Sequence, residues 1–294
     1  MATNEKLQNK FVQYFMVSGL DVNFGLEPDE ILHSLDLIPG DTSPLDRSYK
    51  PRILRHYPDM TSWSHFNPEA LSRLCLPNGL RFSNDKSRYP PSCHPFVLTK
   101  EDGSKSCGFS LVYLEEVKDL NVCHALHSLQ KMHNTETECG TIKKTERVRP
   151  SSAGRQNNAR SRSLPRHYTT RLSGSTLELS TASYDYRNDT LYATKSISLI
   201  CSLPLQHAAS QVLHSIHRFI NRTDYDINIL ESFIYNLLYD IPLPSPGRSV
   251  RFWCLGEVAS ISLPKVPVEL DLFDYPLIQF FDLLGVTYYK ITII

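Results

Sequence analysis

Residues 96–114 read FVLTKEDGSKSCGFSLVYL, and this stretch decides how the chain folds. Two runs rich in apolar, β-branched and aromatic residues, FVLT and FSLVYL, flank a polar turn that contains Asp102 and Gly103. An Asp-Gly pair tolerates the positive φ that tight hairpin turns require, and the flanking residue types favour strands. The stretch therefore predicts two adjacent antiparallel strands.

Further strands are predicted on either side of this hairpin. Residues 11–17, FVQYFMV, are apolar or aromatic on both faces, which is typical of a strand in the middle of a sheet. Residues 191–201, LYATKSISLIC, predict another strand, and residues 250–255 a shorter one.

Helices are predicted between and after these strands, from apolar residues that recur at helical spacing. Short helices are expected to open at residues 27–30 and at Asn67, where Pro and acidic residues stand as they do at helix N-termini. Longer helices are expected over residues 115–132, 206–220 and 229–238. Together these elements predict a mixed, layered α/β domain of the α+β type.

Composition excludes several classes of protein. The 294 residues are 41% apolar and carry 31 basic and 31 acidic side chains, so no global charge draws the chain to nucleic acid. The seven cysteines show no Cys-x-x-Cys pair, which argues against a zinc ribbon, and their odd number is typical of reduced thiols. No apolar run reaches the length of a membrane span, and the first ten residues are too polar for a signal peptide. We predict a cytoplasmic protein.

The sequence spacing of the histidines and cysteines does not suit a metal site, and no known catalytic motif is present. The histidines gather in two predicted helices, as Cys123, His124, His127 and His133 in one and as His214 and His217 in the other. A helix directs His133 away from its neighbours, so no three donors converge, and we expect both groups on solvated faces. No serine-hydrolase elbow, His-Glu-x-x-His or glycine-rich phosphate loop occurs. We predict no catalytic residue, no metal and no cofactor.

Residues 141–188 differ in composition from the rest of the chain and predict a disordered, basic insert. Between Thr141 and Leu172 nine Lys and Arg side chains stand against one acidic residue, Glu146. Such a tract suits either a solvated linker or contact with an anionic membrane. Tyr168 is the one large aromatic residue in the tract on which a base could stack, and we predict no nucleic-acid partner.

A short motif in the insert matches a known recognition pattern. Arg160-Ser-Arg-Ser-Leu-Pro165 fits the Arg-Ser-x-Ser-x-Pro pattern that 14-3-3 proteins bind once the second serine is phosphorylated. A phosphate on Ser163 would add about −1.5 to −2 charges among arginines. We hypothesise a regulatory site formed by Arg160, Ser163 and Pro165.

Several motifs, taken in order along residues 11–285, resemble the upstream segment of DENN-domain proteins, which are exchange factors for Rab GTPases. These motifs are Tyr14-Phe-Met-Val-Ser-Gly-Leu-Asp21, Arg55-His-Tyr-Pro58, Leu74-Cys-Leu-Pro-Asn-Gly79, Phe96-Val-Leu-Thr-Lys-Glu-Asp-Gly103 and Gly108-Phe109. Others resemble the subgroup whose full-length members also carry RUN and PLAT domains: Gly25-Leu-Glu-Pro-Asp-Glu30, Lys131-Met-His-Asn134, Asp189-Thr-Leu-Tyr192, Ser232-Phe-Ile-Tyr-Asn236, Pro242-Leu-Pro-Ser-Pro-Gly-Arg-Ser249 and Leu272-Phe-Asp-Tyr-Pro276.

The resemblance implies a longin-like lobe over residues 11–285, with a central antiparallel sheet flanked by helices. In relatives a second α/β lobe follows, and a Rab GTPase docks across both lobes. Here the sequence ends on TYYKITII, so we expect the second lobe to be missing and residues 286–294 to be a tail outside the family pattern.

The implied function is that of a Rab exchange-factor component in vesicle trafficking, weakened or inactive alone, without catalytic side chains. The implied location is the cytoplasm, at the surface of Golgi or endosomal membranes. The alternative is a non-catalytic adaptor or inert fragment that uses its basic insert to bind a phospho-dependent partner or a membrane.

Overall fold

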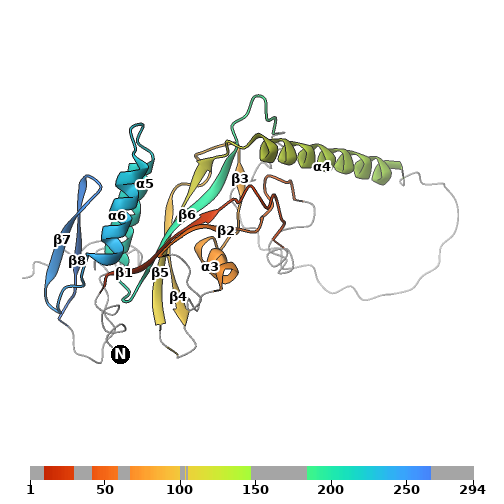
Figure 1. Cartoon of the computed structure of the whole chain (residues 1–294). Coiled ribbons are helices and arrows are strands. Elements are labelled where there is room, and N and C mark those ends of the chain that lie inside the picture. Colours follow the sequence, from red (N-terminus) through yellow and green to blue (C-terminus); the bar gives the residue numbers. More distant parts are fainter. Residues whose placement is uncertain are drawn as a thin grey trace, which may run out of the picture.

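The fold is seen in a computed structural model that describes residues 10–29, 42–58, 67–99, 103, 105–146 and 184–265; for residues 136–146 it describes the backbone. The elements are β1 (Val12–Gly19), β2 (Arg52–Tyr57), α3 (Pro68–Cys75), β3 (Phe82–Ser83), β4 (Ser92–Thr99), β5 (Lys105–Glu116), α4 (Leu120–Glu146), β6 (Tyr192–Cys201), α5 (Gln206–Ile220), α6 (Ile227–Tyr239), β7 (Ser249–Cys254) and β8 (Glu257–Ser262). Figure 1 shows a central sheet with α5 and α6 on one side and α3 on the other. The predicted mixed fold, a central antiparallel sheet flanked by helices, is confirmed.

The main sheet has the strand order β2-β1-β6-β5-β4, and β3 pairs with one end of β6. Every pairing within it is antiparallel. The central position of β6 follows from its sequence, because eight of its ten residues are buried and lie alternately on the two faces. Strands from the beginning, middle and later part of the described chain therefore meet in one sheet.

Two apolar layers hold the helices against the sheet. On one face, Phe109, Leu111 and Leu199 pack against α5, whose stripe of buried residues includes Val212 and Ile216. On the opposite face, Met16, Ile200 and Phe96 pack against Leu71 and Cys75 of α3. The predicted amphipathic helices at 206–220 and 229–238 are confirmed as α5 and α6, and their apolar stripes are the ones that are buried.

The hairpin at 96–114 is confirmed as β4 and β5, and its register sets Phe96 directly opposite Gly108. Phe96 is 9% exposed, and a Cβ atom on Gly108 would stand 2.1 Å from its ring carbon Cε2. The ring therefore covers the space that the missing side chain leaves. This close approach explains why a glycine stands in the middle of a long strand, where it otherwise weakens packing.

Replacing Gly108 by Ala is expected to lower the free energy of unfolding by about 1–3 kcal/mol, because the Phe96 ring must leave its place. The measurement is urea unfolding of the wild type, Gly108→Ala, Phe96→Ala and the double variant. In the Phe96→Ala background the added methyl group meets no ring, so Gly108→Ala should cost much less there. Equal costs in both backgrounds would disprove the explanation.

The predicted helix start at Asn67 is confirmed. The Asn67 side chain accepts hydrogen bonds from the backbone N–H groups of Glu69 (2.9 Å) and Ala70 (3.4 Å), and Pro68 opens the helix. The prediction that a helix opens at residues 27–30 was wrong for residues 27–29, the part that the structure describes. Pro28 instead forms an isolated β-bridge with Tyr49, because the acidic side chains beside it bind cations rather than cap a helix.

The predicted boundaries of the helix and insert after β5 were also wrong. Helix α4 begins at Leu120, where the Asp119 side chain accepts from two backbone N–H groups, and it runs on to Glu146. It thus takes in the first six residues of the predicted insert. At the other end Tyr184 is 1% exposed and packs with Val122 and Leu126 of α4. Residues 147–183 of the insert lie outside the described residues.

A second, two-stranded sheet consists of β7 and β8. The strand predicted at 250–255 is confirmed as β7, and the turn that joins it to β8 has positive φ at Leu255 (52°) and at Gly256 (101°). Two successive positive φ values are typical of a tight two-residue hairpin turn. The inner face of this hairpin, with Cys254, Ala259 and Ile261, is buried against the core that contains α5.

Candidate functional site

A groove runs between the main sheet and the turn that joins α5 to α6; we call it the sheet–helix groove. It consists of two adjoining cavities of about 600 Å³ and about 310 Å³. The residues that line both cavities are Leu54, Tyr113, Glu115, Lys195, Ile220 and Tyr225. Its floor is the sheet, at β2, β6 and β5, and its wall is the end of α5 and the beginning of α6.

The wall exposes apolar side chains that a packed core would hide. Tyr225 is 42% exposed and Ile227, the first residue of α6, is 44% exposed. Tyr225 is held by an edge-on contact with the ring of Phe219, whose centroid lies 6.3 Å away. Exposed apolar side chains beside a concave surface are one feature of binding sites.

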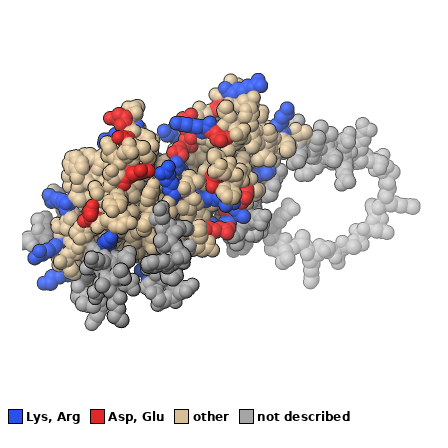
Figure 2. Space-filling view, viewed as in Figure 1, with Lys and Arg blue, Asp and Glu red and all other residues tan. Residues whose placement is uncertain are grey.

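Two ion pairs border the groove, and the other charged residues of its lining balance in sign: Lys86, Glu116, Lys118 and Asp119. Lys195 Nζ on β6 lies 2.7 Å from a Glu115 carboxylate oxygen on β5, across the floor. At the second cavity Arg55 Nη1 on β2 lies 3.2 Å from Glu231 Oε1 on α6. Figure 2 shows basic and acidic side chains side by side over the middle of the visible face. The groove is therefore an apolar surface with matched charges, suited to a folded partner rather than to a strongly charged ligand.

Two titratable rings meet beside the first cavity. The ring of Tyr113 lies 4.6 Å, centroid to centroid, from the ring of His217 on α5. Burial, with smaller effects of Glu115 and Tyr225, raises the pKa of Tyr113 far above its usual value, so its hydroxyl stays neutral. Burial lowers the pKa of His217, and the electrostatic effects of nearby His214, Lys86 and Arg218 lower it further.

The lowered pKa of His217 predicts a pH dependence of stability. Its pKa in the folded chain lies below the ordinary value of 6.5, so below about pH 6.5 the unfolded chain takes up a proton that the folded chain resists. The contribution of His217 to stability is therefore complete above pH 6.5 and falls as the pH drops below it. Denaturant unfolding between pH 7.5 and 5 should show a steeper loss for the wild type than for His217→Gln, whereas parallel curves would contradict the assignment.

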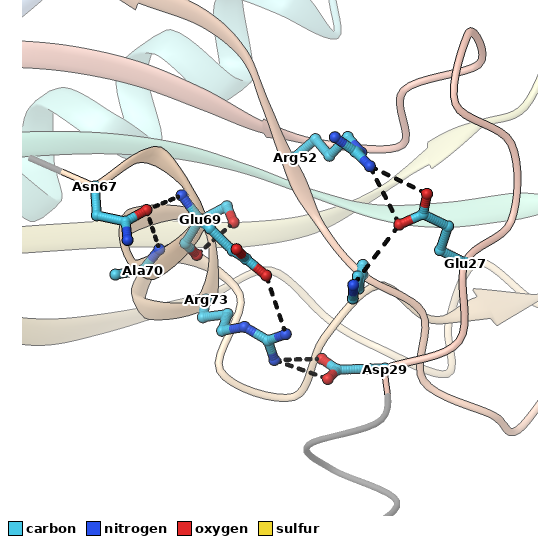
Figure 3. Close-up of polar contacts among 9 residues, drawn as sticks. Glu27, Asp29, Arg52, Asn67, Glu69, Ala70 and Arg73 are labelled. Atoms are coloured by element: carbon cyan, nitrogen blue, oxygen red, sulfur yellow. Dashed lines mark hydrogen bonds and ion pairs between the residues drawn. The ribbon is translucent and has the colours of Figure 1, made fainter.

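A separate cavity of about 420 Å³ is bordered by Lys50, Arg52 and Arg73, as well as by the first residues of α3. Figure 3 shows that Arg52 and Arg73 already have acidic partners, and Lys50 Nζ lies 3.8 Å from Glu27 Oε2. Arg52 Nη2 donates to both carboxylate oxygens of Glu27, and Arg73 Nη1 donates to both oxygens of Asp29 at 2.7 and 3.0 Å. These ion pairs connect Glu27 to β2 and Asp29 to α3. Because the cations are already paired, we assign the cluster a structural role and not the binding of an anion.

None of the described cysteine and histidine candidates from the sequence lines the groove. Arg160, Ser163 and Pro165 lie outside the described residues. His127 Nδ1 is 2.9 Å from the carbonyl oxygen of Tyr184, and the ring centroid of His124 lies 4.0 Å from that of Tyr186, with the two planes tilted by 45°. His124 is exposed, as expected, whereas His127 is half-buried because the chain that returns from the insert packs on it.

No three His, Cys, Asp or Glu side chains of the described residues gather as metal ligands. Burial raises the pKa of Cys75 and of Cys254 to about 11, and it also raises the pKa of Cys93 and Cys107. These thiols stay protonated at neutral pH and are poor nucleophiles. No described helix is both long and apolar enough to cross a membrane.

Sequence reasoning missed the groove, although one signal was present. Tyr225 and Ile227 are apolar residues in the otherwise polar connection between two amphipathic helices. Such residues in a short turn have no core to enter unless another element faces them. The Arg55-His-Tyr-Pro58 motif, quoted above for its resemblance, supplies Arg55 and Tyr57 to the second cavity.

Comparison with known families gives two matches along the chain. The uDENN domain matches residues 51–113 and the DENN (AEX-3) domain matches residues 192–290. No solved structure matches the chain. The prediction of an upstream segment alone was too narrow, because the DENN match begins at β6, inside the lobe that was assigned to that segment.

The two matched segments are interleaved in space. Strand β5, nearly all of it in the uDENN match, pairs along its length with β6 of the DENN match. The groove is also shared, because Leu54 and Tyr113 come from the first match while Lys195 and Tyr225 come from the second. The matches together cover more than half of the 294 residues. The chain therefore belongs to the DENN-domain proteins.

Proposed function

We propose that the chain is a component of a guanine-nucleotide exchange factor for a Rab GTPase and that the GTPase docks on the sheet–helix groove. The observation that carries the proposal is that both family segments contribute to this one apolar surface. Membership of the family suggests a Rab GTPase as the partner, and the groove is the surface among the described residues on which we propose that it docks. The setting we propose is vesicle trafficking, in the cytoplasm at the surface of Golgi or endosomal membranes.

Exchange of this kind needs no nucleophile or proton relay. A protein that binds the nucleotide-free GTPase more tightly than its GDP-bound form lowers the affinity for nucleotide by the same factor, by linkage. The groove can act in this way if its contacts form with switch segments in the nucleotide-free arrangement. Paired charges such as Arg55 and Glu231 would then set orientation, while Tyr225 and Ile227 contribute apolar contact.

The test is release of fluorescent GDP from a panel of Rab GTPases, with and without the chain. Acceleration of release from at least one Rab supports the proposal. A flat trace across the panel, from a chain that is folded by circular dichroism, would remove it.

A second candidate function rests on the basic insert. We propose that phosphorylated Ser163 recruits a 14-3-3 protein, independently of the groove. A peptide of residues 155–170 with phosphate on Ser163 is expected to retain 14-3-3 in a pulldown, because a dianionic phosphate pairs with cationic residues in such a site. The unphosphorylated peptide is the matched control. Absence of retention by the phosphorylated peptide would end this proposal and leave the first untouched.

A further inference from the structure

The outer face of the β7–β8 hairpin carries an apolar pair that nothing in the described residues covers. Trp253 and Val258 are cross-strand partners, and they are 68% and 60% exposed. Alternation along the strands explains their position, since Cys254 and Ala259 point to the buried side. A tryptophan that exposes two thirds of its surface on a sheet face is unusual, and it marks a contact surface.

The hairpin is supported on one of its two faces. Within the described ranges β7 pairs with β8 and with no other strand. A two-stranded hairpin is marginally stable in water unless a third strand or a packed element supports it. The inner face has such support from the core that contains α5, and the Ser260 N–H on β8 donates to Gln211 Oε1 of α5 at 3.4 Å, while the outer face has no support among the described residues.

The chain that follows β8 fits this face in composition. Strand β8 ends at Ser262, and three residues separate it from residues 266–290. Of these 25 residues 15 are apolar, a larger share than the 41% of the whole chain. The DENN match spans the hairpin and these residues alike, so both belong to one family segment. A segment that starts this close to the hairpin can reach its outer face at little cost in chain entropy.

Charge complementarity points to the same occupant. The exposed cations on and beside the hairpin are Arg248, Arg251 and Lys265. Residues 266–290 carry four acidic side chains, Glu269, Asp271, Asp274 and Asp282, and one basic residue, Lys290. Figure 2 shows Lys and Arg side chains along the end of the molecule where Figure 1 labels β7 and β8. A second copy of the hairpin would instead bring like charges together.

We propose that residues 266–290 of the same chain pack on the outer face of the β7–β8 hairpin and cover Trp253 and Val258. The contact is intramolecular and does not depend on binding of a GTPase. In this arrangement the hairpin lies between two parts of the DENN match: the part in the main sheet and residues 266–290.

A photo-crosslinker at one of the two exposed positions tests this proposal in the full chain. Val258 is replaced by p-benzoylphenylalanine, and adducts are mapped by mass spectrometry. The same residue at Val97, which is 58% exposed on β4, is the matched control. The proposal predicts an adduct to residues 266–290 from Val258, within one chain, and none from Val97. An adduct at the mass of two chains, or no adduct from Val258, would overturn it.

Tryptophan fluorescence gives a second readout. The sequence contains Trp63 and Trp253, so a Trp63→Phe background reports on Trp253 alone. Acrylamide quenching of Trp253 should rise at least twofold when this chain is ended after Lys265. Unchanged quenching, in a truncated chain that keeps the wild-type circular dichroism, would contradict the proposal. If the truncated chain fails to fold, the crosslinking result in the full chain decides.

Discussion

Replacement of Arg73 by Ala is expected to lower the free energy of unfolding by about 3 kcal/mol. The Asp29 side chain is 1% exposed, and Arg73 Nη1 binds it at 2.7 Å. Removal of Arg73 takes a counter-ion from a carboxylate that water cannot reach, and removal of one partner of a buried ion pair costs about 3–5 kcal/mol. We place the effect at the low end because the Arg73 side chain is itself 23% exposed.

The chain offers a control pair at the surface with the same shortest N···O distance. Arg88 Nη2 lies 2.7 Å from Asp46 Oδ1, but the two side chains are 46% and 28% exposed. Water can replace the lost partner there, so Arg88→Ala should cost less than about 1 kcal/mol. Urea unfolding of both variants measures the difference. Equal losses would show that burial of Asp29 does not govern the strength of the Arg73 pair.

A second variant separates charge from packing at the same place. In the Arg73→Ala background, Asp29→Asn replaces a buried carboxylate by a neutral amide of nearly the same shape. Part of the lost stability should return, because a neutral polar group is less costly to bury than a charge. A further loss in the double variant would mean that Asp29 is held mainly by its other contacts.

Replacement of Ile227 by Asp is expected to reduce acceleration of GDP release at least tenfold for any Rab that responds to the wild-type chain. Ile227 is 44% exposed on the wall of the groove, and docking would have to strip water from the new carboxylate. The variant should fold, because Ile227 is the first residue of α6 and acidic residues stabilise helix N-termini.

Ile229→Asp is the matched control for this loss. Ile229 has the same side chain, lies in the same first turn of α6 and is 53% exposed, but it lines neither cavity of the groove. Its replacement should leave exchange within about twofold of wild type. If both variants lose activity equally, the effect belongs to α6 as a whole and not to the groove.

The parts of the fold that the sequence predicts well are those with a strong local pattern. The hairpin at β4 and β5 has an Asp-Gly turn between apolar runs, and α5 and α6 have long apolar stripes. Strand β2, RILRHY, lies at the sheet edge and no residue in it is fully buried, so it has no alternation to recognise. The later part of α4 was missed because its sequence is polar and carries little amphipathic signal.

The candidate site was harder to predict because its residues meet only after folding. Arg55 and Glu231 are 176 residues apart in the chain, and the ion pair between Lys195 and Glu115 spans 80. No local motif encodes such pairs, since they arise from strand order and from the position of α6. Resemblance to a family had singled out the Arg55 segment, but its contact with α6 could be seen only in the folded chain.

The most direct test of the account compares the affinity of the full chain for one Rab GTPase in two states, by isothermal titration calorimetry. The Rab is the one that shows the largest acceleration of GDP release, prepared nucleotide-free and bound to GDP. The account predicts at least tenfold tighter binding to the nucleotide-free form, and loss of most of that preference in Ile227→Asp but not in Ile229→Asp. Equal affinity for the two forms, or a preference that survives Ile227→Asp, would contradict docking on the sheet–helix groove as the source of exchange.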